Sequence, residues 1–256
     1  MSVEISGLLE RRARKLVELG LYGSVSEVVR DALRRYFETL DLKRVALDLY
    51  LLKDVSLSYA AEIAGLSYDE FLDYLLYRGV QPLLGVLSSS EVDVVEGELL
   101  LDPSSVHTIY KSRLAEVLPK TKDLEINLLV PKQLEARVQA LNALRVRLGL
   151  PAIPISSYVE LDVDDQEEPK SITSLEKACV DYARKEGITL ISDDIRVRSE
   201  ATRNGTRTGS SLSILETLIR RNVFESEIEI AEVLYSLRAV PVLIPIELEE
   251  RWLARK

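Results

Sequence analysis

Carboxylates stand where hydrophobic segments end or helices begin in this chain, and their placement suggests metal chemistry. Asp102 follows the apolar run Leu99–Leu101, and the pair Asp193 and Asp194 follows a second apolar run. Glu176 begins a segment with helical periodicity. Because ligands bind at the carboxyl ends of parallel strands, we expect these groups to meet there. Clustered carboxylates repel one another unless a hard cation holds them, and oxygen ligands suit Mg²⁺ or Mn²⁺. Such a site can assist phosphodiester hydrolysis.

Composition is that of a globular chain with a full core. The 256 residues suggest one large domain or two small ones, and 46% are hydrophobic and 29% charged. No apolar run approaches the roughly 20 residues of a spanning helix, and the N-terminus has no signal-peptide pattern, so we expect no membrane partner. The only cysteine, Cys179, lies in an apolar helical stretch and is expected in the core. These features indicate a cytoplasmic protein.

The charge of the chain is uneven. The net charge of −9 argues against a broad phosphate-binding surface. Residues 1–37 carry seven Lys/Arg and five Asp/Glu, a local net charge of +2. Any nucleic-acid contact is therefore expected to be local.

The first forty residues predict a short strand and two helices. Val3 and Ile5 alternate with polar residues, a helical pattern spans residues 8–19, and Ser24 or Ser26 can cap a second helix. Residues 23–33 (GSVSEVVRDAL) resemble a ribbon-helix-helix domain. That resemblance implies a homodimer with paired strands that present three residues to operator DNA: Ser2, Glu4 and Ser6. Because a glutamate opposes phosphates, dimerisation is favoured over DNA reading, and an ordinary helical hairpin is the alternative.

Residues 41–87 predict a helix over 42–52 and then a helix-turn-helix unit over 56–77. Residues 55–71 (VSLSYAAEIAGLSYDEF) resemble a family of small prokaryotic antitoxin-like proteins. The second helix of the unit carries Asp69, Glu70 and Asp73, which repel DNA phosphates. Packing against protein is therefore favoured over DNA reading. Several of residues 88–97 are small and polar, so this segment is predicted to be a linker.

Residues 98–256 alternate between strand and helix patterns, which predicts an α/β fold with a parallel sheet. Expected strands cover 99–101, 126–130, 158–163 and 188–192. Expected helices cover 104–117, 131–148, 173–186, 212–222 and 227–239, and residues 240–244 form a short apolar run.

This C-terminal part resembles a PIN domain, a nuclease fold of many prokaryotic toxins. The matching segments are 101–106 (LDPSSV), 176–183 (EKACVDYA) and 187–194 (GITLISDD). The resemblance implies a parallel sheet with helices on both faces and metal-dependent cleavage of RNA. Asp102, Glu176 and Asp193 would be the catalytic metal ligands, and Asp194 a ligand or an orienting group. Four arginines after the acids would bind phosphates: Arg196, Arg198, Arg203 and Arg207.

The chain departs from the pattern of the family at two places. Pro103 replaces a threonine, and the second acid of the family has no clear counterpart. Glu135 is the nearest carboxylate, but it comes one or two positions early, and Arg137 occupies one plausible slot. A shift of one residue turns a helical side chain by about 100°. Glu135 is thus a candidate metal ligand. The direction of its side chain decides between an active nuclease and a catalytically degenerate one.

Three interpretations follow. The first is a metal-dependent ribonuclease fused to an antitoxin-like dimerisation module. The second is a catalytically degenerate PIN-like protein that acts as a dimeric DNA-binding regulator, which is favoured if Glu135 points away from the acids. The third is a structural assembly module. The single histidine, His107, cannot form a zinc site without thiols, and we expect it in solvent or behind the first motif.

Overall fold

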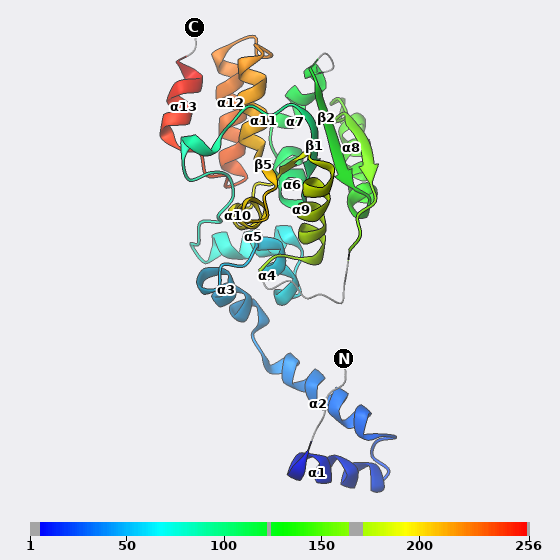
Figure 1. Ribbon diagram of the computed structural model, residues 1–256. Coiled ribbons are helices and arrows are strands. Elements are labelled where there is room, and N and C mark those ends of the chain that lie inside the picture. The colour runs from blue at the N-terminus through cyan, green and yellow to red at the C-terminus, as the bar shows by residue number, and fades with distance from the viewer. Residues whose placement is uncertain (1–5, 122–123, 164–170, 255–256) are drawn as a thin grey trace.

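The computed structural model describes residues 6–121, 124–163 and 171–254. Its N-terminal part is helical. The helices α1 (Gly7–Glu18) and α2 (Val25–Thr39) pack on each other as a hairpin, which lies apart from the remaining elements in Figure 1. The Ser24 side chain accepts a hydrogen bond from the Glu27 N–H and so begins α2. The predicted strand around Val3 and Ile5 lies outside the described residues.

Three further helices follow and lie between the hairpin and the sheet in Figure 1. They are α3 (Leu42–Leu52), α4 (Leu57–Ala64) and α5 (Tyr68–Tyr77), with the bounds that the sequence predicts. Ser56 caps α4, Gly65 ends it with a φ of 65°, and Ser67 forms a capping box with Glu70 at the start of α5.

Five parallel strands form the sheet. They are β1 (Gly97–Leu101), β2 (Ile126–Pro131), β3 (Ile155–Val159), β4 (Thr189–Ile191) and β5 (Arg207–Gly209), in the order β3-β2-β1-β4-β5. The predicted parallel α/β fold is therefore confirmed. From β1 the chain winds outward to β2 and β3 and then returns to β4, so the winding direction reverses between β1 and β4. That boundary is the topological switch point at which ligands bind in open α/β sheets.

Helices cover both faces of the sheet. One face packs on α6 (Pro103–Lys111), α7 (Leu114–Val117), α8 (Glu135–Arg147), α11 (Ser211–Arg220), α12 (Glu227–Ala239) and α13 (Ile246–Leu253). The other face packs on α9 (Ser174–Glu186) and α10 (Ile195–Arg203). Along β1 the buried residues alternate between these layers, with Leu99 and Leu101 on the first face and Leu100 on the second. No helix within the described ranges is long and apolar enough to cross a membrane.

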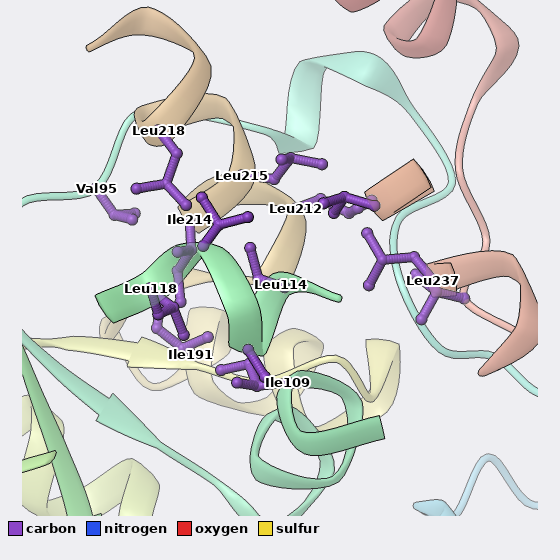
Figure 2. Packing of buried hydrophobic residues seen from close by; sticks show 14 of the residues in the cluster. Val95, Ile109, Leu114, Leu118, Ile191, Leu212, Ile214, Leu215, Leu218 and Leu237 are labelled. Carbon is purple, nitrogen blue, oxygen red and sulfur yellow. The ribbon is translucent and has the colours of Figure 1, made fainter. Parts of the chain in front are cut away.

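The first face holds the larger core. Figure 2 shows Ile191 of β4 near Leu118 and near Ile109 of α6, and the leucines of α11 belong to the same cluster. Val95, in the segment expected to be a linker, packs into the same core, and Val92 is also buried there. Residues 88–97 thus contribute apolar contacts to the domain.

Several predicted bounds shift for local reasons. The expected helix 104–117 divides into α6 and α7, because Ser112 is extended with φ −111° and ψ 166°. Pro131 stays in β2, and α8 begins at Glu135 after a short 3₁₀ turn. The strand expected at 158–163 lies at Ile155–Val159. The short elements α10, β5 and α13 were not predicted.

Candidate active site

The carboxylates expected to form the site lie at the switch point. Asp102 directly follows β1, and Asp193 and Asp194 follow β4. Glu176 comes from the first turn of α9. All four side chains are buried, with relative exposures of 0–1%. We call the buried region around these four carboxylates the acid crevice.

Ser104 links the two strand ends. Its hydroxyl donates to Asp102 Oδ1 (2.7 Å) and accepts from the N–H groups of Asp193 (2.8 Å) and Asp194 (3.1 Å). The Ser105 N–H donates to Asp102 Oδ1 (2.8 Å), so Asp102 also caps α6. The hydroxyl that the sequence lacks at Pro103 is thus supplied by the next residue.

Asp193 and Glu176 each keep one oxygen without a partner. Asp193 Oδ1 accepts from the N–H and the hydroxyl of Ser211, both at 2.9 Å. Glu176 Oε2 accepts from the Thr173 N–H (2.8 Å) and the Ser56 hydroxyl (2.7 Å). The other oxygens, Asp193 Oδ2 and Glu176 Oε1, are buried and have no hydrogen-bond partner among the described residues. The Thr108 hydroxyl lies near Asp193 and lowers its pKa.

Helix α4 covers the acid crevice with its N-terminus. Asp194 Oδ1 accepts from the Arg196 N–H (2.9 Å), and Oδ2 accepts from the N–H of Leu57 (2.7 Å), the first residue of α4. The preceding residue, Ser56, bonds Glu176. The N-terminal end of a helix carries partial positive charge, so α4 compensates part of the negative charge below it. We call helices α3–α5 and their connections, residues 42–77, the covering unit.

Burial dominates the electrostatics of the acid crevice. Desolvation raises the pKa of Glu176 to about 8, helped by the charges of Asp194 and Asp102. It raises the pKa of Asp102 to about 6, and it also raises the pKa of Asp193 and of Asp194. None of the four forms a salt bridge with Lys or Arg within the described residues. Backbone N–H groups and the nearby charges of Arg196 and Arg198 offset part of this effect at Asp194.

The four expected phosphate-binding arginines divide into buried and exposed pairs. Arg196 donates to Asp54 Oδ1 (2.8 Å) and the Tyr50 carbonyl (2.6 Å), and it stacks on the Tyr50 ring at 4.1 Å. Arg198 donates to the carbonyls of Ser192 (2.7 Å) and Gly85. Both are bound inside the protein.

The exposed arginines lie further from the acids along the chain. Arg203 is on the last turn of α10 and lies 3.5 Å from Glu200. Arg207, in β5, donates to the Gly187 carbonyl.

Glu135 does not join the acid crevice. Its carboxylate lies 2.8 Å from Lys132 Nζ and accepts from Gln139 (2.9 Å). Arg137 instead extends to Asp69 of the covering unit at 3.3 Å. This is the arrangement that favours the degenerate alternative.

The residues expected to read DNA lie at the N-terminus. Ser2 and Glu4 lie outside the described residues. Ser6 is exposed and precedes α1 without a side-chain capping bond.

Tyr68 and His107 extend the site beyond the expected residues. The Tyr68 hydroxyl is buried without a hydrogen-bond partner among the described residues. Burial and the charges of all four acids raise its pKa well above the usual range, so it lies against the acid crevice. Its ring is 4.8 Å from the buried His107 ring. Local sequence identifies Ser56 as a helix cap, but it carries no signal that Ser56, Leu57 or Tyr68 meets acids more than a hundred residues away.

The donor set suits a hard divalent cation. All the donors are carboxylate oxygens, and two of them are buried without partners. In the described part of the chain, no three Asp, Glu, His or Cys side chains converge closely enough to hold an ion. The type of donor thus fits Mg²⁺ or Mn²⁺, whereas the spacing of the carboxylates does not form a metal site among the described residues.

Comparison of the chain with protein-family models, with curated proteins and with solved structures found no match. The functional assignment therefore depends on the residues and geometry of the acid crevice.

Proposed function

We propose that the chain is a metal-dependent ribonuclease of PIN type, fused to an antitoxin-like dimerisation module. The observation that carries the proposal is the burial of four carboxylates at the switch point of a parallel sheet. The acids come from the three segments that resemble the PIN domain. The parallel order of the strands and the helices on both faces agree with that resemblance.

Asp102, Glu176 and Asp193 would hold Mg²⁺ or Mn²⁺. When bound, such an ion polarises a phosphoryl oxygen and lowers the pKa of a water molecule. The protein orients each ligand through a hydroxyl or an N–H: Ser104 holds Asp102, Ser211 holds Asp193 and Thr173 holds Glu176. Asp194 serves as an orienting group, because both of its oxygens cap helices.

The N-terminal hairpin would make the chain a homodimer. Large apolar side chains of α1 and α2 are exposed, including Leu33 (44%), Tyr36 (59%) and Phe37 (51%). In a second copy of the chain the same surface would cover them. Paired N-terminal strands could then contact operator DNA, as the ribbon-helix-helix resemblance implies.

Cleavage of labelled single-stranded RNA in Mn²⁺ tests the nuclease. We expect the variant Asp102→Asn/Asp193→Asn to cleave at least about a hundredfold more slowly, because metal ligation contributes several kcal/mol and each tenfold corresponds to about 1.4 kcal/mol. The variant Asp48→Asn/Asp93→Asn is the control, since both aspartates are exposed and outside the acid crevice. Cleavage that survives in the first variant would remove these carboxylates from the mechanism.

A second candidate is the degenerate PIN-like regulator of transcription. The position of Glu135 outside the acid crevice favours it, because only the acids after β1 and β4 and on α9 then remain as ligands. Selection of bound fragments from a random duplex DNA library tests this function. Enrichment of a motif with no RNA cleavage under any divalent metal would favour the regulator over the nuclease.

A further inference from the structure

The covering unit has its own apolar core. Its buried side chains pack mainly on one another, separately from the two cores of the sheet: Ala46, Leu47, Tyr50, Val55, Leu57, Phe71, Leu72 and Leu75. Its contacts with the acid crevice and the cations around it are polar, through Ser56, the Leu57 N–H, Asp54 and Asp69. A body with an internal core and a polar contact surface can separate from its neighbour without exposing much apolar area.

One carboxylate of the covering unit binds Arg196. Asp54 lies 2.8 Å from Arg196 Nε, and the other side-chain contacts of this guanidinium are the carbonyl and ring of Tyr50, also in the covering unit. Arg196 Nη1 is buried without a partner among the described residues. The side chain of Arg196 therefore depends on the covering unit for its partners and would be free to bind another oxyanion if that unit moved.

A second carboxylate pairs with two cations, and beside them lies a histidine whose pKa is lowered to about 4 by burial. Asp69, on α5, lies 3.5 Å from Lys111 Nζ, 3.3 Å from Arg137 Nη2 and 3.3 Å from His107 Nδ1. These three side chains come from α6 and α8, on the face of the sheet opposite α10. The three side chains thus surround one oxyanion, which is the carboxylate of Asp69 in the covering unit.

The two carboxylates flank the acid crevice. Arg196 follows Asp194 on one face of the sheet, and His107 follows Asp102 on the other. Tyr68, next to Asp69, lies against the His107 ring and near the acids. Arginine and lysine beside a carboxylate site suit the backbone phosphates of a nucleic-acid strand that crosses the site.

We propose that the covering unit occupies the nucleic-acid binding surface of this protein, with Asp54 and Asp69 in the places of two backbone phosphates of a single-stranded RNA. The proposal rests on the ribonuclease function and names the surface that its substrate uses. It also explains how a chain of net charge −9 would bind a nucleic acid locally, because the cations concerned are paired with the chain's own carboxylates. RNA and the covering unit then compete for the same cations.

Binding of a short fluorescein-labelled single-stranded RNA, measured by anisotropy in EDTA, tests this surface without chemistry. The variant Asp54→Asn/Asp69→Asn removes both carboxylates. Asp54 has a φ of 59°, which asparagine tolerates, its side chain is largely exposed and that of Asp69 is partly exposed, so the fold should persist. Asp48→Asn/Asp93→Asn gives the same change in net charge at two exposed aspartates that do not pair with Arg196, Lys111 or Arg137 in the described structure. Thermal melting checks that both variants fold.

We expect the Asp54→Asn/Asp69→Asn variant to bind the RNA about tenfold more tightly than the wild type and the charge-matched control, because partly exposed ion pairs of modest strength are lost. Adding Lys111→Gln and Arg137→Gln should remove the part of the gain that comes from Asp69 and leave the part that comes from Arg196. Equal affinity of the two double variants, or a gain that the glutamine substitutions leave undiminished, would overturn the proposal. RNA binding without cleavage in Mn²⁺ would instead count against the nuclease alone.

Discussion

At the residue scale, the burial of Glu176 makes the free energy of unfolding depend on pH. Its carboxyl is fully buried, one of its oxygens has no partner in the described structure, and its pKa is raised to about 8 from an ordinary 4.5. Between these two values the unfolded chain releases the proton that the folded chain keeps. The free energy of unfolding therefore falls as the pH rises from 4.5 to 8.

Glu176→Gln should remove this pH dependence. The glutamine carbonyl can accept the bonds from Thr173 and Ser56, and its amide carries no charge to desolvate. In metal-free buffer we expect the variant to be more stable than the wild type at a pH of about 8.5, by on the order of a few kcal/mol, and similar to it at about pH 4.5. Thermal melting at both pH values measures the difference, with Glu135→Gln as the control outside the acid crevice. An offset that does not change with pH would contradict the expectation.

At the element scale, the connection between the covering unit and the sheet is fixed by backbone contacts. The Gly85 N–H donates to the Asp193 carbonyl (2.8 Å), and the Leu243 N–H donates to the Leu84 carbonyl (2.7 Å). This segment therefore joins the acid crevice to the apolar run at 240–244. The run is not a strand of the sheet, but it pairs with this connection.

Gly85→Ala should destabilise the protein by more than about 2 kcal/mol. Gly85 has a φ of 93°, and a Cβ there would lie 2.3 Å from the Leu243 carbonyl oxygen. Gly205→Ala is a matched control, because Gly205 has a φ of 77° but no atom within 4 Å of an added Cβ. Urea denaturation of both variants separates the energetic cost of the clash with Leu243 from the cost of a positive φ at alanine. Equal losses in the two would show that the close approach to Leu243 has no energetic cost.

At the scale of the whole molecule, the chain divides into an exposed hairpin, a covering unit and an α/β body. The hairpin exposes apolar side chains, whereas the covering unit buries its own and presents polar groups to the body. These differences suit different partners: a second copy of the chain for the hairpin, and the acid crevice for the covering unit.

Leu33→Asp/Phe37→Asp should convert a dimer into a monomer, since both substitutions place charge on the exposed apolar face of α2. Size-exclusion chromatography with light scattering reads the mass directly. Ile228→Asp/Tyr235→Asp is the control, because these α12 side chains are also exposed (70% and 79%) but far along the chain from the hairpin. A wild-type chain that is monomeric at all concentrations would refute the dimer.

Much of the fold could be predicted from local patterns. The helices at 42–52, 57–64 and 68–77 follow from serine and aspartate caps and from Gly65, and β1, β2 and β4 follow from short apolar runs. The elements that the sequence does not predict include β5, which has only three residues. They also include α10, which is rich in arginine and has few apolar residues to form a buried face. Their positions depend on neighbours rather than on their own sequence.

The amino-acid sequence by itself determined which carboxylates end strands and begin helices, because apolar periodicity and capping act within a few residues. It placed Asp102, Glu176, Asp193 and Asp194 at one edge of a parallel sheet. Only the tertiary structure decided that Arg137 extends to Asp69, that Arg196 pairs with Asp54, and that α4 covers the acids. These outcomes depend on contacts between segments tens to more than a hundred residues apart, whose geometry is set by packing of whole elements and not by local propensity.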